Sequence, residues 1–466
     1  MFAHRHHRLI ASVHSVLRSD PSRVAPTEAL PVISDALTVK ILDLAMRIGE
    51  AMFTVGASAH DVTYAITSVT SAYHLSGVHV DVTYNSITAS YHHGDEARPT
   101  TMLRVVRVAS PDHAKLQRLQ ALLVDITGGL ELDAARAQFR SIRRTPFLYR
   151  MPVVIVSQAL LAAGVALMFN ASLVIIGLSF LAALAAALVQ AGLARLRVPS
   201  FFSQIAGAFV TTVVATVVAA LGAAGIAPFV GIRPSIIVAA GIVLMLAGLT
   251  VVGAAQDAID GFALTASGRI LDLTMQTIGV VLGILIGLEL ARVLGFGMMS
   301  PIDPIPLGPL PAQLGGAAIV AIAVAVFNGA GLRIVAVSAA LSLIAISTYS
   351  GLIALSFHAA AASAVAALLA SFAGILVAHR LHVPSVAVTT AAIVPLVPGL
   401  AVFRGLLGLM DSDGSAESLL VGTTPLVLAT TVGIGLAAGV SLGLYLGTPV
   451  RVTLSSVAKS RSRVRR

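Results

Sequence analysis

The sequence has no cysteine, no tryptophan and few charged residues. Without cysteine it can form no disulfide, no thiolate metal site and no cysteine nucleophile. Without tryptophan, any aromatic belt at a membrane interface consists of Tyr and Phe. Only 11% of the residues are charged and 57% are hydrophobic, whereas about 25% are charged in a typical soluble protein. The composition therefore predicts a polytopic α-helical membrane protein.

The excess positive charge lies outside the most apolar part of the chain. Residues 1–150 carry 16 Lys and Arg against 13 Asp and Glu, and residues 151–450 carry eight of each. Residues 451–466 carry six basic residues and no acidic one. Basic residues beside membrane segments favour the cytoplasmic side. We therefore interpret the formal charge of +9 as a membrane flank, and we predict no nucleic-acid partner.

The first third of the chain has the pattern of a soluble domain. Residues 1–33 are rich in His, Arg and Pro and are predicted to be disordered, with no apolar run typical of a signal peptide. Residues 34–148 are predicted to form a cytoplasmic α+β domain. We expect helices at 35–55, 58–75, 111–126 and 133–142, and strands at 78–82, 86–91 and 101–108.

Ten apolar stretches follow, each close to the 20 residues that a helix needs to cross a bilayer. An even number of crossings and the arginines of alternate loops place both termini in the cytoplasm. The stretches are 151–170, 172–193, 202–224, 234–256, 270–294, 312–328, 331–349, 353–378, 384–408 and 420–447.

Two motifs recur about 150 residues apart. Pro234-Ser235-Ile236 resembles Pro384-Ser385-Val386, and rows of glycine at four-residue spacing begin at Gly279 and Gly435. These matches predict two five-helix halves, 151–300 and 301–450, followed by the basic cytoplasmic tail 451–466. Because five is odd, the second half is inverted relative to the first, as in many secondary transporters. A competing register of about 185 residues matches 195–200 with 380–385.

The densest polar cluster lies between the fourth and fifth stretches. Its carboxylates could take up a proton or hold an amino group, and its arginine could hold a carboxylate. The alternative is a solvated loop with helix caps. The predicted site residues are Gln256, Asp257, Asp260, Thr265, Ser267 and Arg269. Glu289, late in the fifth stretch, is expected to pair with Arg292 at the outer surface.

A second candidate group lies in the ninth stretch. Pro398 and Gly399 belong to a Pro-Leu-Val-Pro-Gly motif that is predicted to break the helix and expose backbone groups to an anion. Thr389, Thr390 and Arg404 flank this break. The alternative is a simple proline kink. We hypothesise that the broken fourth and ninth helices meet near the midplane, with Arg269 and the Pro398–Gly399 break facing the carboxylate of a substrate.

The sequence contains no motif for a known energy-coupling or hydrolytic site. No G-x-x-x-x-G-K-[ST], H-E-x-x-H or G-x-S-x-G pattern occurs, and we predict no catalytic residue, no metal site and no cofactor. A transporter of this kind would draw on ion gradients, and the alternative is a passive pore.

Several separated blocks, in the same order, resemble the threonine/serine exporter family over about residues 35–447. They include Pro199–Gln204, Gln256-Asp257 with Thr265–Arg269, and Pro395–Ala401 with Arg404-Gly405. The resemblance implies a carrier in the bacterial inner membrane that exports small hydroxy amino acids and is coupled to protons, most simply by antiport. A dicarboxylate (succinate-like) exporter on the same fold and a membrane-anchored hydrolase are the alternatives, and a homo-oligomer is left open.

Overall fold

The computed structural model describes residues 35–92, 99–106, 110–245, 248–295, 307–381, 383–410, 412 and 415–464. The predicted disordered segment 1–33 lies outside these residues. The chain divides into residues 1–40 and residues 41–466. Of the first unit the structure describes only the start of a helix, so the contacts discussed below belong to the second.

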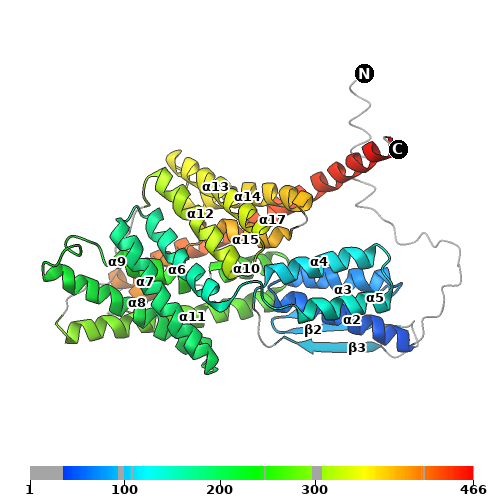
Figure 1. The fold of residues 1–466 in the computed structure, drawn as a ribbon, viewed down its shortest axis with the longest axis horizontal. Helices are drawn as coiled ribbons and strands as arrows, with labels where there is room; N and C mark the ends of the chain where they lie inside the picture. The colour runs from blue at the N-terminus through cyan, green and yellow to red at the C-terminus, as the bar shows by residue number, and fades with distance from the viewer. Residues whose placement is uncertain are drawn as a thin grey trace, which may run out of the picture. The chain divides into compact units, whose positions relative to one another are not determined.

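The soluble part has the order of elements that the sequence predicts. Four helices lie over one face of a three-stranded sheet (Figure 1). The strands pair antiparallel in the order β1-β2-β3, with Val78 opposite Tyr91 and Ser86 opposite Val105. The elements are α2 (Asp35–Thr54), α3 (Ala59–Ala72), β1 (Val78–Thr83), β2 (Ser86–Tyr91), β3 (Thr100–Val105), α4 (His113–Thr127) and α5 (Leu132–Arg144).

Local sequence signals set the ends of these helices. The Ser58 hydroxyl accepts a hydrogen bond from the Asp61 amide and caps α3, and Asp112 caps α4 by accepting from the Lys115 amide. These caps satisfy backbone donors that a helix leaves free at its first turn. The sheet contributes Val82 and Ile87 to a core that includes the apolar faces of the helices. The apolar faces of the helices and the sheet thus pack into a layered domain.

Eight helices in the described part of the chain are long and apolar enough to cross a membrane. The described part of the chain is therefore mostly helical, with one small sheet. The long apolar helices are α6 (Met151–Met168), α7 (Leu173–Arg195), α8 (Ser200–Ala223), α11 (Ala263–Val293), α12 (Leu310–Phe327), α13 (Leu332–Ala354), α14 (Ala359–Leu381) and α17 (Ala416–Val464).

The other two predicted stretches contain shorter helices in the described part of the chain. The stretch 234–256 contains α9 (Ser235–Met245) and α10 (Gly248–Ile259), and residues 246–247 lie outside the described residues. The stretch 384–408 is divided into α15 (Ser385–Ile393), the 3₁₀ turn η1 (Val394–Leu396) and α16 (Gly399–Met410). Each of these pieces is too short to cross a bilayer by itself. The count of ten crossings therefore stays a prediction.

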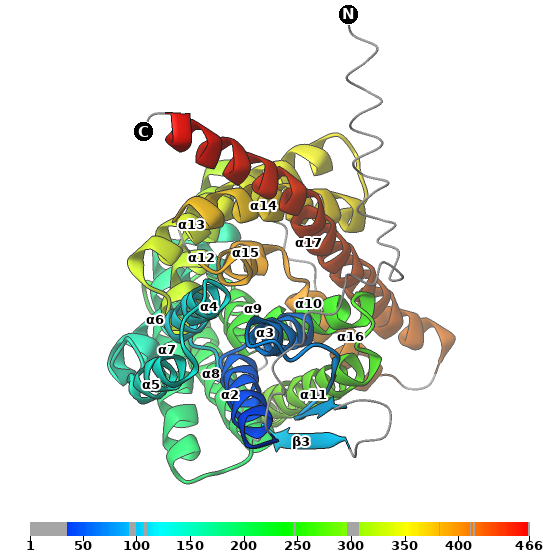
Figure 2. The same ribbon diagram turned by 90° about the vertical axis from the view of Figure 1, so that its right-hand side faces the viewer.

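Corresponding helices pack together in the two halves. Helix α8 packs on α11 as α14 packs on α17, and the second of these pairs runs side by side in Figures 1 and 2. Likewise α6 packs on α7 as α12 packs on α13, and α10 packs on α11 as α16 packs on α17. The same correspondence relates the contact of α9 with α7 to that of α15 with α13.

Helices α6 and α12 correspond to each other in this scheme, and they pack directly together in opposite directions. The Gly308 amide, just before α12, donates to the carbonyl of Met168 at the end of α6 (2.8 Å). At the other end, the Tyr149 hydroxyl, just before α6, donates to the carbonyl of Ala330 after α12 (2.7 Å). Helices α6 and α12 are therefore antiparallel.

The glycine rows are the contact surfaces of the two largest helix pairs. A Cβ at Gly279 of α11 would lie 2.9 Å from the Phe201 carbonyl oxygen of α8. A Cβ at Gly435 of α17 would lie 2.6 Å from the Ala360 carbonyl oxygen of α14. Both distances are shorter than real Cβ contacts, so only glycine permits this approach. Small residues in a row allow such close packing in lipid.

Candidate functional site

Asp257 and Arg269 form an ion pair where α10 ends and α11 begins. Arg269 Nη1 lies 3.0 Å from Asp257 Oδ2, and the Asp257 side chain is only 1% exposed. Gly253, one turn earlier in α10, leaves room for the guanidinium, because a Cβ there would lie 2.9 Å from Nη1. Gly261, with φ of +91°, lets the chain turn from α10 into α11. The structure therefore brings together two predicted site residues.

Thr265 connects this turn to the β1–β2 hairpin. Its hydroxyl donates to the Val82 carbonyl and accepts from the Tyr84 amide, both at 3.1 Å. The side chain is fully buried. In the described conformation Thr265 thus fastens α11 to the soluble domain, 181 residues away in sequence from Tyr84.

Tyr84 extends this attachment along α11. Its hydroxyl donates to Asp272 Oδ2, and this hydrogen bond raises the pKa of Tyr84 to about 12. The ring lies against Gly268, where a Cβ would overlap ring atoms. Tyr84 itself adopts a left-handed φ of +42° at the tip of the hairpin. Any side chain at position 268 would displace the ring.

The remaining residues of the first group are less enclosed. Gln256 is half-buried on α10, and Asp260 is exposed in the turn. Ser267 is exposed, and its hydroxyl donates to the Ala263 carbonyl of its own helix. The soluble domain adds Asp61 at the start of α3, where burial raises the pKa of that carboxyl while the Ser58 hydroxyl lowers it. The side chain of Phe262, within the turn, packs on the core of the soluble domain.

The second predicted group lies at the break in the ninth stretch. The hydroxyls of Thr389 and Thr390 donate to carbonyls of their own helix, the first to Ser385 at 2.8 Å. Gly399 is buried and Pro398 is half-buried. Arg404 is half-buried on the following helix, α16.

The two groups lie on different segments of the membrane part. Arg269 contacts Asp257 and α10, whereas the break at Pro398 lies between α15 and α16. Helix α16 packs on α9 and on α11, which brings the broken ninth stretch beside both neighbours of α10. A common site for both groups remains a prediction.

Gln190 of α7 and Gln204 of α8, which were not among the predicted site residues, lie beside Met245 of α9. The Gln190 amide donates to Gln204 Oε1 (3.0 Å), and the Gln204 amide donates to the carbonyl of Met245 (3.4 Å). Met245 is the last described residue of α9. The two amides therefore link α7, α8 and α9 by hydrogen bonds. Amide side chains between apolar helices are the signal that could have identified them.

A second loop attaches the membrane helices to the soluble domain. The His113 amide at the start of α4 donates to the Asn328 carbonyl (2.8 Å), at the end of α12. His113 is 7% exposed, and its burial lowers the pKa of the imidazole to about 4. The soluble domain is thus attached both to the α10–α11 turn and to the α12–α13 loop.

Comparison with known protein families decides what kind of protein carries this arrangement. The family described as "Putative threonine/serine exporter" matches residues 43–291. The chain belongs to the threonine/serine exporter family. A second profile, "Threonine/Serine exporter, ThrE", matches residues 313–444 of this exporter.

Two curated relatives extend along nearly the whole chain. The "Probable threonine/serine exporter" of Mycobacterium tuberculosis is 32% identical over 93% of this chain and 82% of its own length. The "Threonine/serine exporter" of Corynebacterium glutamicum is 29% identical over 92% of this chain and 86% of its own length. No solved structure matches. This member of the family is therefore a multi-pass membrane protein of amino acid export.

Proposed function

We propose that this chain exports threonine, serine or a similar small amino acid across the bacterial inner membrane in exchange for protons. The match to the exporter family along both membrane halves carries the proposal. The buried Asp257–Arg269 pair supplies a group for each end of a zwitterionic substrate. Arg269 suits the carboxylate, and the ionised Asp257 suits the ammonium group.

Exchange follows if a proton and the substrate ammonium compete for Asp257. The ionised carboxylate binds the amino acid on the cytoplasmic side. Protonation from the outside removes the charge that holds the ammonium group, and the substrate leaves. Return of the proton to the cytoplasm restores the carboxylate. A carboxylate in an apolar protein environment is suited to this role because both of its charge states are accessible.

The membrane part is proposed to consist of two inverted five-helix repeats, with the fourth and ninth stretches each acting as one crossing. The matching helix pairs and the antiparallel α6–α12 contact support this arrangement. Inverted repeats place a substrate site near their interface and allow the site to open alternately to either side. Asp257 would then change its access through movement of α10 and α11 relative to the soluble domain.

The proposed orientation has the soluble domain and both termini in the cytoplasm. The two attached loops lie next to Arg269 and Arg333, Arg143 and Arg144 end α5, and Arg150 immediately precedes α6. Basic loops favour the cytoplasmic side.

Transport into inside-out membrane vesicles tests the proposal. With an imposed proton gradient, acidic inside, wild-type vesicles should accumulate labelled threonine, and a protonophore should abolish the accumulation. Asp257→Asn and Arg269→Gln should each lower the initial rate at least about tenfold, because each removes a charge-assisted hydrogen bond to substrate. Excess serine should compete, whereas succinate should not.

Glu289→Gln is the matched control. Glu289 forms an ion pair with Arg292, as expected, but both side chains are exposed, at 59% and 77%. Its loss should leave the rate unchanged. Wild-type rates in well-expressed Asp257→Asn and Arg269→Gln would refute this site, and succinate-dependent accumulation would refute the amino acid substrate.

A further inference from the structure

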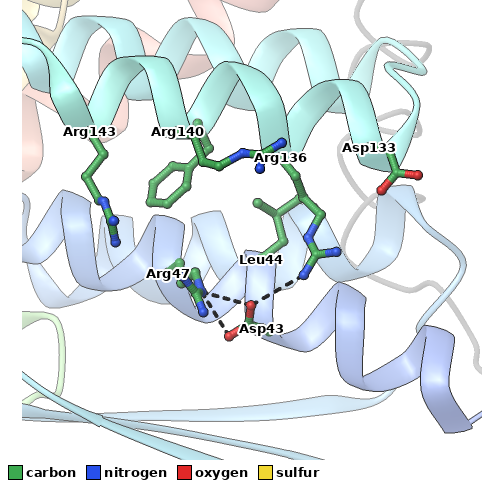
Figure 3. Close-up of a pocket in the computed structure, with 8 residues that line it drawn as sticks. Asp43, Leu44, Arg47, Asp133, Arg136, Arg140 and Arg143 are labelled. Carbon is green, nitrogen blue, oxygen red and sulfur yellow. Dashed lines mark hydrogen bonds and ion pairs between the residues drawn. The ribbon is translucent and has the colours of Figure 1, made fainter.

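The soluble domain contains a basic groove between α2 and α5. Two adjoining pockets of about 410 and 290 Å³ share Arg47, Phe139 and Arg143 in their walls. We call this pair of pockets the basic groove. Figure 3 shows Arg136 and Arg143 extending from α5 toward α2, where Arg47 and Asp43 lie.

The charge of the groove is strongly unbalanced. Six cationic side chains line it against three carboxylates. The carboxylates are Asp43, Glu50 and Asp133, and the cations are Arg47, Arg104, Lys115, Arg136, Arg140 and Arg143. Such an excess in one concave surface attracts multivalent anions.

Asp43 organises part of this cluster. Its carboxylate lies 2.8 Å from Arg47 and Arg104 and 3.7 Å from Arg136. Burial alone would raise the pKa of Asp43, but its hydrogen bonds and charge attraction to Arg47 and Arg104 hold the pKa below its usual value. One carboxylate therefore holds three guanidinium groups in place, and it neutralises only one of them.

Arg140 and Arg143 have no ion pair within the described part of the chain, and both are exposed. With Arg136 they recur at four- and three-residue spacing, so all three lie on one face of α5. Like charges at this spacing disfavour a helix. An anion bound between them would remove that repulsion, and Phe139 at the wall of the groove offers an apolar surface beside it.

We propose that the basic groove binds a phosphate group, with Arg47, Arg140 and Arg143 as its direct ligands. Guanidinium groups match the oxygens of phosphate in pairs. Three cations lining one groove exceed what a single carboxylate needs, and this argues against the zwitterionic export substrate. The phosphate could come from a soluble phosphorylated metabolite or from a lipid headgroup, because only six residues separate α5 from α6.

Calorimetric titration of the full-length purified protein with inorganic pyrophosphate tests the groove. In discs of phosphatidylcholine, the wild type should bind pyrophosphate at one site, more weakly at high salt because screening shortens the reach of the charges. Arg140→Gln/Arg143→Gln should weaken binding at least about tenfold. Arg118→Gln, an exposed arginine on α4 outside the groove, should bind as the wild type does.

Discs of phosphatidylglycerol separate the two sources of phosphate. Weaker pyrophosphate binding in these discs would support a lipid headgroup in the groove, and unchanged binding would support a soluble ligand. Equal binding by the wild type and the folded double variant, or no binding by the wild type, would overturn the proposal. The measurement needs no transport, so its failure is separate from any failure of the proposed export activity.

Discussion

The two membrane halves pair their helices alike but differ in the polar contacts of the fourth and ninth stretches. In the first half, the Gln204 amide bonds the Met245 carbonyl of α9, and Asp257 near the end of α10 pairs with Arg269. In the second half, the break contains Pro395 and Pro398, and the hydroxyls of Thr389 and Thr390 donate to carbonyls of their own helix. Helix packing is therefore shared between the halves, whereas these polar contacts differ.

The difference has a physical cause. Proline lacks a backbone donor and leaves the carbonyl four residues earlier without its helical partner, which breaks the ninth stretch. The fourth stretch has no proline after Pro234, and a side-chain amide of α8 contacts one of its carbonyls instead. Equivalent packing with unequal chemistry predicts that substitutions at the glycine rows act alike in both halves, whereas substitutions at these polar contacts do not.

The largest effect is expected from replacing glycines where α8 packs on α11 and where α14 packs on α17. Gly283→Leu and Gly439→Leu place side chains against the carbonyls of Ile205 and Ala364. Because backbone cannot move aside, each change should destabilise the fold by about 3 kcal/mol or more. The fraction of monodisperse protein in size-exclusion chromatography, after mild detergent extraction, should fall to a similar extent for both.

Gly177→Leu on α7 is the matched control, because a Cβ there meets no atom within 4 Å. It should leave the monodisperse fraction unchanged. If the monodisperse fraction falls for only one of Gly283→Leu and Gly439→Leu, the two helix pairs do not pack equivalently.

The next effect concerns the loop that attaches the second half to the soluble domain. The pKa of His113 in the folded protein, about 4, lies below its ordinary value of 6.5 because burial opposes the charge. The unfolded chain therefore binds the proton first, and stability is lost as pH falls from about 6.5 toward 4. Between pH 7 and pH 5 the loss should be about 2 kcal/mol.

Thermal unfolding followed by circular dichroism at the two pH values measures this loss. His113→Asn should reduce the difference in melting temperature, whereas His74→Asn, which changes an exposed histidine, should not. The attachment of the first half through Tyr84 should persist at both values, because a tyrosine with a pKa near 12 stays protonated. If the melting temperature of His113→Asn falls between pH 7 and pH 5 as much as that of the wild type, His113 does not cause the loss of stability.

The smallest effect should distinguish the polar contacts of the two stretches. Gln204→Leu removes the hydrogen bond between α8 and the Met245 carbonyl of α9, which should cost about 1 kcal/mol and lower threonine transport about fivefold. Thr389→Val removes only a bond within its own helix and should leave transport within about twofold. Initial rates in the vesicle assay provide the comparison. Equal rates in the two variants would show that the two stretches do not differ in this way.

The sequence predicted the fold well wherever local patterns determine it. The predicted helices at 35–55 and 58–75 and the strands at 78–82 and 86–91 appear in the structure close to their predicted bounds. Eight of the ten apolar stretches correspond to long apolar helices, and the ninth is divided. These features depend on residues near one another in the chain, which is why periodicity and capping rules reach them.

The site was only partly predictable. Asp257 and Arg269 stand out because charges are rare in the membrane region, and they do form a pair. Thr265 stood out for its polarity, yet in the described conformation both of its bonds hold a hairpin of the soluble domain. Tyr84 gave no signal, since its partner Asp272 lies 188 residues away. Contacts of that range depend on how two domains dock, which no local pattern encodes.

The attachment of Tyr84 to α11 also has a consequence for biosynthesis. Domains generally fold from the N-terminus as the chain emerges from the ribosome. The hairpin is therefore complete long before residue 265 has been made, and its tip waits without a partner. Thr265 can reach it only if the intervening segments have been inserted so that the chain returns to the side where Tyr84 lies. A chain inserted with the wrong topology would therefore leave the tip of the hairpin without its hydrogen bonds to α11.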